Sequence, residues 1–188
     1  LDSSERRMRT LFRALPRKTV FHEGYMDNDG VLESRKRIRV KVEVEGDSLH
    51  VDYTGTDSQS VGPLNVSESM AHCFAFMGVK AAIDPPGPIN SGCFRPIRVT
   101  VPKGTMLNAE NPAPAGGMAE VGQTAIFTMV ALSKLAPGLV SAEEGAGSNH
   151  QNLGGVDMRF DDPHRYIYYD YPSGGSGGRQ DKDGLDFV

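Results

Sequence analysis

Hydrophobic and polar residues alternate along the segment 35–53, and this is the clearest pattern in the chain. Between Ile38 and Val44 every second residue is apolar, and the residues between them are charged. Gly46-Asp47 interrupts the alternation, which resumes at Leu49 and continues to Tyr53. Alternation with a period of two predicts strands that have one buried and one solvated face, and glycine beside aspartate favours a turn. We therefore predict an antiparallel hairpin.

Three other segments repeat their apolar residues every three or four positions, which predicts helices. The first begins at Asp2 or Ser3, either of which can cap it, and stops at Pro16. The second begins at Val66 and ends before Asp84-Pro85, and the third covers 119–135. We expect these residues on the buried faces: Met8, Leu11, Phe12 and Leu15; Met70, Cys73, Phe74, Met77 and Ala81; Val121, Ala125, Met129 and Leu132. The small and sulfur-containing residues of the second helix predict close packing.

Shorter alternations predict the remaining strands. One strand is expected within 18–30, ending in a polar turn, and another at 97–101. A second hairpin joins 156–160 to 166–171, and 143–155 before it is a glycine-rich polar loop. These elements predict an α+β fold, in which antiparallel hairpins pack with two or three helices and carry long Gly/Pro-rich loops. We see no repeat and no linker that would divide residues 1–188 into domains.

The segment 84–120 is the most unusual stretch of the chain. It holds seven of the twelve prolines and five of the glycines. Proline fixes φ and glycine admits conformations that other residues avoid, so such a segment forms a shaped, irregular surface. Its apolar anchors Cys93, Phe94 and Met106 argue against disorder. Loops of this length inside a compact domain are often functional.

Composition excludes several classes of function. The net charge of −4 is spread without a basic stripe, which argues against nucleic-acid binding. No apolar run approaches the roughly 20 residues of a membrane span, and the charged, helix-like first segment is not the pattern of a signal peptide, so we expect neither. The spacing of Cys73 and Cys93 matches no zinc or redox motif. Two buried thiols in a cytoplasmic protein are the favoured interpretation, and a disulfide is the alternative.

Several familiar motifs fail on inspection. The Asp27–Gly30 run resembles a calcium loop, but Tyr25 and Lys36 stand where acidic ligands belong. Residues 174–178 satisfy G-x-S-x-G without a helical pattern after them, which argues against a serine hydrolase. There is no P-loop and no G-x-G-x-x-G fingerprint. The five histidines contain no pair at i, i+4 spacing, so we predict no metal ligands in this chain.

The strongest polar cluster is the run 148–152 between glycines. Its side chains offer donors and acceptors, and the glycines let backbone approach a ligand. We assign Asn149 and His150 to catalysis and Asn152 to substrate binding, although a turn that satisfies its own backbone is the plainer interpretation.

Three further residues are candidates outside that cluster. Glu120 follows Gly116-Gly117 at a predicted helix start, where exposed N–H groups favour anions, and we assign it to catalysis. Its plainer role is to complement the helix dipole. Arg95 could clamp a carboxylate or carbonyl, or only order its loop. Asn65, at the end of the polar loop 54–65, is assigned with Arg95 to substrate binding.

Four runs of residues resemble one known family. They are NSGCFRPIRVTVPKGTMLN (90–108), PAPAGGMAEVGQT (112–124), VDYTGTDSQSVGPLN (51–65) and LDSSERRMRTLFRALP (1–16). Together they resemble the hydantoinase B family, which includes the B-type half of ATP-dependent oxoprolinases and related subunits of acetone and acetophenone carboxylases. The resemblance covers essentially the whole chain. Because B-type subunits of this family are several times longer, it implies that 1–188 is an internal fragment.

The resemblance also implies a division of labour. A hydantoinase A-like partner binds ATP with Mg and activates the substrate, and the B-type half opens the cyclic amide, a hydantoin or 5-oxoproline. Any divalent metal of the parent would be held by motifs that lie N-terminal to this region, outside the chain. The family has paired asparagines before a Gly-Gly, where His150 replaces one of them here, and a glutamate that matches Glu120.

Three alternatives to a cyclic-amide hydrolase stay open at this point. The parent could be a ketone carboxylase of the acetone or acetophenone type. The chain could instead be a structural module that docks a partner subunit and has no catalytic residues of its own. It could also be an independent domain that binds a small ligand. The substrate is not predicted by any residue of the sequence.

Overall fold

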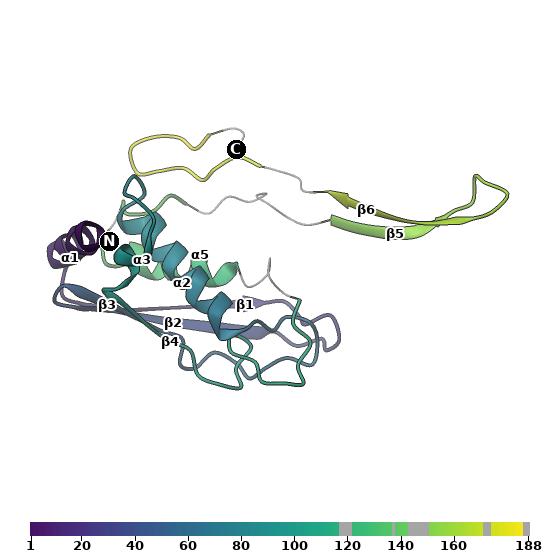
Figure 1. The fold of residues 1–188 in the computed structure, drawn as a ribbon, viewed down its shortest axis with the longest axis horizontal. Coiled ribbons are helices and arrows are strands. Elements are labelled where there is room, and N and C mark those ends of the chain that lie inside the picture. Colours follow the sequence, from purple (N-terminus) through teal and green to yellow (C-terminus); the bar gives the residue numbers. More distant parts are fainter. Residues whose placement is uncertain (117–121, 137, 143–150, 171–173, 186–188) are drawn as a thin grey trace. The chain divides into compact units, whose positions relative to one another are not determined.

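The computed structural model describes residues 1–116, 122–136, 138–142, 151–170 and 174–185, and of Gln151 and Asn152 only the backbone. The chain forms two compact units, Leu1–Val140 and Ser141–Val188. Figure 1 shows their elements, and each unit is considered by itself.

The first unit is built on a four-stranded sheet. Its strands are β1 (Thr19–Met26), β2 (Lys36–Glu45), β3 (Ser48–Asp52) and β4 (Ile97–Thr100), in the order β1-β2-β3-β4. The predicted hairpin is confirmed, with Val42 opposite Val51 across β2 and β3. Strand β4 pairs parallel to β3, so the sheet is mixed. The sequence pattern predicted the strand at 97–101 and not this parallel pairing.

Burial along the hairpin follows the alternation. Ile38, Val40 and Val42 are fully buried, whereas Arg39 between them is exposed. Leu49, Val51 and Tyr53 continue the core from the returning strand. Helices lie over the apolar face of the sheet (Figure 1). The side chains of that face are removed from water beneath the helices and form the core.

The helices of the first unit are α1 (Asp2–Ala14), α2 (Glu68–Ile83), the one-turn α3 (Ser91–Phe94) and α5 (Gln123–Ser133). In α1, Met8 and Phe12 are fully buried as predicted. The predicted caps are wrong, because the N-cap is Leu1 and the Leu1 carbonyl already accepts the Glu5 N–H at 3.0 Å. Helix α5 buries Ala125 and Leu132, and Val121 lies outside the described residues.

The predicted buried face of α2 is wrong. Cys73 and Met77 are exposed, and the helix instead buries its smallest residues, among them Ala71, Ala75 and Gly78. Any Cβ at Gly78 would stand 2.7 Å from the Ala125 carbonyl oxygen, so α2 and α5 approach at a distance that only small residues allow. The larger Phe74, Phe76 and Met77 are half-buried or exposed, whereas Val79 and Lys80 are buried. The Cys73 thiol is exposed rather than buried, whereas Cys93 is buried as expected.

The Gly/Pro-rich stretch is a shaped surface, as predicted, over the described part of 84–116. Cys93 and Met106 are buried, and the half-buried Phe94 stacks on Phe76 with ring centroids 4.8 Å apart. The buried Asn108 carboxamide donates to the Val101 carbonyl at 2.9 Å. The irregular backbone is thus held by side-chain contacts rather than by the regular hydrogen bonds of a β-sheet.

The second unit contains β5 (Gln151–Asp157) and β6 (His164–Asp170), paired antiparallel. The predicted hairpin is confirmed, but β5 begins earlier than expected, so 151–155 is strand and not loop. The Gly154-Gly155 pair does not break the strand because the Tyr166 ring, opposite Gly155, occupies the space of the missing side chain. Among the described residues of the whole chain, no helix is long and apolar enough to cross a membrane.

Candidate functional site

Backbone hydrogen bonds hold the glycine-rich tail of the second unit, residues 174–185, in place. The Ala142 N–H donates to the Gly178 carbonyl at 2.8 Å, and the Ser176 N–H donates to the Leu185 carbonyl at 2.9 Å. A Cβ at Gly177 would stand 1.7 Å from the Ala142 carbonyl oxygen, so the close approach requires glycine. The tail is therefore fixed beside the residue that precedes the segment 143–150.

Most of the predicted polar cluster, 148–152, lies outside the described residues. Ala142, the last described residue before it, donates to Gly178 of the tail, and Gln151, the first described residue after the gap, pairs with Asp170 on β6. Asn149 and His150 lie outside the described residues, and so does Glu120. The backbone of Asn152 lies on β5 opposite Tyr169, and its side chain is not described. Their assigned roles stay predictions.

Asn65 is fully buried and holds two loops together. Its amide nitrogen donates to the carbonyls of Ser60, Gly62 and Pro114 at 2.8–3.1 Å. Its amide oxygen accepts the Ser60 N–H at 2.7 Å. The side chain is thus engaged with the chain's own backbone, and it fixes the loop at Pro114 that leads toward Glu120.

Asp29 extends this network, and sequence reasoning missed it. The segment 27–30 was expected to be a polar turn, yet Asp29 is only 1% exposed. Its carboxylate accepts the Ser60 hydroxyl and the N–H groups of Val31 and Leu32. These donors, the Ser60 hydroxyl first, hold the pKa of Asp29 well below its ordinary value. No local pattern marked it, because its main partner is 31 residues away.

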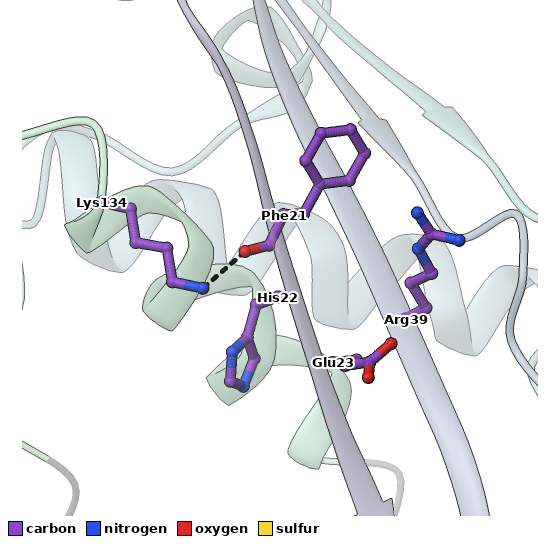
Figure 2. Close-up of a pocket in the computed structure, with 5 residues that line it drawn as sticks. All are labelled: Phe21, His22, Glu23, Arg39 and Lys134. Atoms are coloured by element: carbon purple, nitrogen blue, oxygen red, sulfur yellow. Dashed lines mark hydrogen bonds between the residues drawn. The ribbon is translucent and has the colours of Figure 1, made fainter.

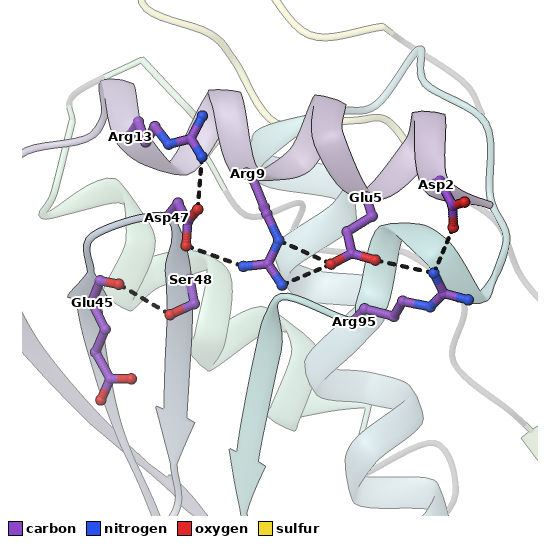
Figure 3. A network of polar contacts seen from close by, with 8 residues as sticks. All are labelled: Asp2, Glu5, Arg9, Arg13, Glu45, Asp47, Ser48 and Arg95. Carbon is purple, nitrogen blue, oxygen red and sulfur yellow. Dashed lines mark hydrogen bonds and ion pairs between the residues drawn. The ribbon is translucent and has the colours of Figure 1, made fainter.

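Arg95 belongs to a network that joins α3 to α1 (Figure 3). Its guanidinium donates to Asp2 at 2.9 Å and to Glu5 at 3.1 Å. Glu5 also accepts from Arg9, which contacts Asp47 at 3.1 Å. The geometry matches the plainer interpretation, an arginine that orders its surroundings, and substrate binding by Arg95 stays a prediction.

A polar pocket lies at the outer edge of β1 (Figure 2). It has a volume of about 330 Å³ and is lined by Phe21, His22, Glu23, Arg39 and Lys134. The Lys134 ammonium donates to the Phe21 carbonyl at 2.5 Å and so caps the free edge of the strand. A second pocket continues it along β1 to Gln123, at the start of α5. The second pocket thus reaches Gln123, where α5 begins; the helix was expected to begin earlier, at 119.

His22 is the group in this pocket best suited to proton transfer. It shares the face of β1 with the buried Val20, and its ring meets Phe127 edge-on with centroids 5.2 Å apart. Burial first, and then the Lys134 charge, lowers the pKa of His22 below its ordinary value. The lowered pKa favours the uncharged ring, in which one nitrogen can accept a proton. The alternation with Val20 was the signal in the sequence that could have placed it.

One described group of side chains has ligand types suited to a metal, namely Glu43, Glu45 and His50. Arg98 already occupies it, because its guanidinium donates to His50 Nε2 at 3.0 Å and to Glu45 at 2.5 Å. A cation in this position disfavours a second one. The prediction that the chain holds no metal ligands is left untested by this geometry.

Known proteins resemble the chain over its whole length. The family model described as hydantoinase B/oxoprolinase matches residues 1–188. A protein of Pseudomonas sp. (strain NS671), named provisionally as the B-type subunit of a D-/L-hydantoinase, is 33% identical over 100% of this chain and 33% of its own length. The beta subunit of the caprolactamase of Pseudomonas jessenii is 28% identical over 84% of this chain and 27% of its own.

Two solved structures have the same fold. The ATP-dependent caprolactamase of Pseudomonas jessenii superposes with a TM-score of 0.79 at 26% identity, covering 98% of this chain and 32% of that one. Nucleotide-free acetone carboxylase superposes with a TM-score of 0.77 at 18% identity, covering 97% of this chain and 26% of that one. At this identity the second likeness concerns the fold alone. The chain spans about a third or less of each of these four proteins.

Proposed function

The chain belongs to the hydantoinase B/oxoprolinase family, and on this premise we propose that it is part of a B-type subunit that opens a cyclic amide. An A-type partner would first activate the substrate with ATP and Mg, which that partner binds. The observation that carries the proposal is the match over residues 1–188. The names of the relatives point to the same substrate class, because hydantoin and caprolactam are both cyclic amides.

The chemistry of ring opening defines what the polar cluster must supply. Attack on an activated amide carbon places negative charge on oxygen, and preorganised donors that face this oxygen lower the barrier. We assign this task to Asn149 and His150, with Asn152 orienting the substrate, and we keep the catalytic role proposed for Glu120 from the sequence.

The two remaining candidates are given indirect roles. Asn65 would position the loop that ends before Glu120, because its carboxamide is hydrogen-bonded to the carbonyl of Pro114 and to the backbone of 60–62. Arg95 would hold α3 against α1 through Asp2 and Glu5. Both are thus positioning residues in this proposal, and neither needs to touch the substrate.

The test is a comparison of two histidines in the complete enzyme. The full B-type subunit and its A-type partner would be assayed for ATP-dependent opening of hydantoin, 5-oxoproline and caprolactam. We expect His150→Ala and Asn149→Ala to lower kcat by about 10²–10³, the cost of an oxyanion donor. His164→Ala, an exposed histidine at the start of β6, is the matched control and should leave kcat unchanged.

The possible outcomes separate the hydrolase from its alternatives. Normal kcat in both variants would overturn the assigned residues. Loss of subunit assembly, measured by size-exclusion chromatography, with normal turnover of whatever complex remains, would favour a docking module. Carboxylation of a ketone, with no cyclic amide opened, would favour the carboxylase alternative, which rests here on fold alone.

A further inference from the structure

A buried carboxylate holds together two loops that lie far apart in the sequence. The side chain of Asp29 has no exposed surface. It accepts the N–H groups of Val31 and Leu32, in its own turn, at 3.0 and 2.6 Å. It also accepts the Ser60 hydroxyl and, at 3.3 Å, the Gly62 N–H. All these hydrogen bonds are charge-assisted, and such bonds are roughly twice as strong as neutral ones.

The loop 60–62 lies directly against the turn that carries Asp29. A Cβ at Gly62 would stand 1.8 Å from the Asp29 carbonyl oxygen, so the close approach requires glycine. The Lys36 ammonium lies 3.9 Å from the carboxylate and balances part of its charge. Neither the turn nor the loop belongs to a strand of the sheet. The carboxylate and this close contact therefore fix one segment against the other.

The same loop seats the backbone that leads to Glu120. Its Pro63 carbonyl accepts the Gly116 N–H at 3.0 Å. The Asn65 carboxamide donates to the Pro114 carbonyl at 2.8 Å. Glu120 follows Gly116, the last residue described before it, by four positions. A chain of hydrogen bonds thus runs from the buried carboxylate to the backbone just before the candidate glutamate.

We propose that Asp29 is a positioning residue for Glu120 and acts through Ser60 and the loop 60–65. The carboxylate fixes this loop, the loop fixes the backbone at 114–116, and covalent continuity passes any shift of that backbone to the residues that follow. The inference rests on the proposed function, in which Glu120 is catalytic. Asp29 does not touch the substrate, because its carboxylate is enclosed by the chain's own donors.

Two variants cut this connection, and a third serves as the matched control. Ser60→Ala removes the hydroxyl donor and leaves the turn at Asp29 with its own N–H groups. Asp29→Asn keeps the size of the side chain and removes its charge. Asp84→Asn does the same to a second buried carboxylate of this unit, whose partners are Arg7 and Lys80 instead. All three are compared well below the melting temperature of the least stable variant, so that each is folded.

Hydrogen exchange tests the positioning without reference to turnover. The complete B-type subunit with its A-type partner is followed by mass spectrometry of the peptides that contain Gly116. We expect Ser60→Ala and Asp29→Asn to speed exchange of the Gly116 amide about tenfold, because the loop that holds it loses a hydrogen bond. Asp84→Asn should leave this exchange unchanged. Unchanged exchange at Gly116 in the first two variants would overturn the proposal.

Turnover of a cyclic amide by the same complex tests whether Asp29 acts through Glu120. We expect Ser60→Ala and Asp29→Asn to lower kcat by up to about 10²-fold, the cost of a misplacement of 1 Å or so. KM should change little, because Glu120 is proposed to act on the transition state. Asp84→Asn should leave kcat unchanged, and an equal loss there would reduce the effect to general destabilisation and overturn the proposal.

A double-mutant cycle completes the test. In the Glu120→Ala background, Asp29→Asn should lower kcat no further, since the group that it positions is gone. Additive losses would overturn the proposal. A normal kcat in Glu120→Ala, together with faster exchange at Gly116 in Asp29→Asn, would refute the catalytic role of Glu120 in the proposed function and confirm that Asp29 holds the segment before it.

Discussion

The buried carboxylate of Asp84 provides the sharpest test of how the first unit is held together. It lies at the end of α2 and its side chain is 3% exposed. Arg7 of α1 donates to it twice, at 2.7 and 2.9 Å, and the buried Lys80 ammonium lies 3.2 Å away. Lys80 also donates to the carbonyls of Asp84 and Gly87. One carboxylate thus faces two cations, one of them half-exposed and the other buried.

We expect Asp84→Asn to be strongly destabilising. At 3.2 Å and an effective dielectric constant of about 20, Coulomb's law gives about 5 kcal/mol between Lys80 and Asp84. Removing one partner of a buried pair costs about 3–5 kcal/mol, because the other charge stays buried without compensation. For a domain of this size the melting temperature should fall by roughly 6–20 °C. The measurement is thermal and urea unfolding followed by circular dichroism.

Two variants serve as controls for this substitution. Arg7→Gln should have a much smaller effect, because its side chain is 50% exposed and the pair is screened by water. Asp47→Asn also removes a carboxylate that faces two arginines, but Asp47 is 35% exposed and should matter little. The reasoning would be refuted if Arg7→Gln or Asp47→Asn cost as much as Asp84→Asn.

Acid titration tests the same site. The Arg7 hydrogen bonds, and then Lys80, lower the pKa of Asp84 below its ordinary value. Its contribution to stability is therefore complete above the unfolded pKa of about 3.9 and is lost as pH falls through the lower folded pKa. We expect Arg7→Gln to raise the folded pKa and make the loss of stability below pH 4 less steep.

Three further predictions concern the Tyr53 hydroxyl, the packing of Gly24 and the protonation of His50. Tyr53→Phe should cost about 0.5–1.5 kcal/mol of unfolding free energy, since the buried Tyr53 hydroxyl donates to the Thr128 hydroxyl at 2.7 Å. Thr128→Val should cost more, about 1–3 kcal/mol, because it leaves the Tyr53 hydroxyl buried and unpaired. Gly24→Ala should cost about 1–3 kcal/mol, because its Cβ would stand 2.1 Å from the Phe127 ring, and Phe127→Ala in the same chain should relieve part of this loss. Burial, and then Arg98, lowers the pKa of His50, so stability should decline as pH falls below about 6.5, and His50→Gln should flatten that slope. Urea unfolding measures all three. A cost of Thr128→Val no larger than that of Tyr53→Phe, no relief of Gly24→Ala by Phe127→Ala, or an unchanged pH slope would contradict the corresponding prediction.

The elements that the sequence predicted well are those whose pattern has one physical cause. In the hairpin of β2 and β3, each residue is either buried or solvated, and period-two alternation reports this choice directly. The buried face of helix α2 was predicted wrongly, because the orientation of the helix depends on how closely Gly78 can approach α5. Helix α5 lies far away in the sequence. A helix that is apolar nearly all round carries no local information about which side meets a neighbour.

The candidate site was less predictable than the fold. Asp29 and Asn65 owe their roles to backbone groups in loops that have no periodicity, so nothing near them in sequence distinguishes them from ordinary turn residues. The same is true of the approach of Gly177 to Ala142. Residue type alone identified Asn149, His150, Asn152 and Glu120 as candidates, and of these four only the backbone of Asn152 is described.

The parallel pairing of β4 with β3 has a consequence for biosynthesis. The antiparallel strands β1 to β3 are contiguous and can form as soon as they leave the ribosome, but 44 residues separate Asp52 from Ile97. At about 5–20 residues per second, the β3 edge waits roughly 2–9 s for its partner strand. During this interval a nascent chain exposes Leu49 and Val51 beside backbone N–H and C=O groups that have no hydrogen-bond partner. Unpaired edges of this kind allow nascent chains on the same mRNA to pair wrongly with one another. Translation speed across α2 should therefore affect the yield of folded protein.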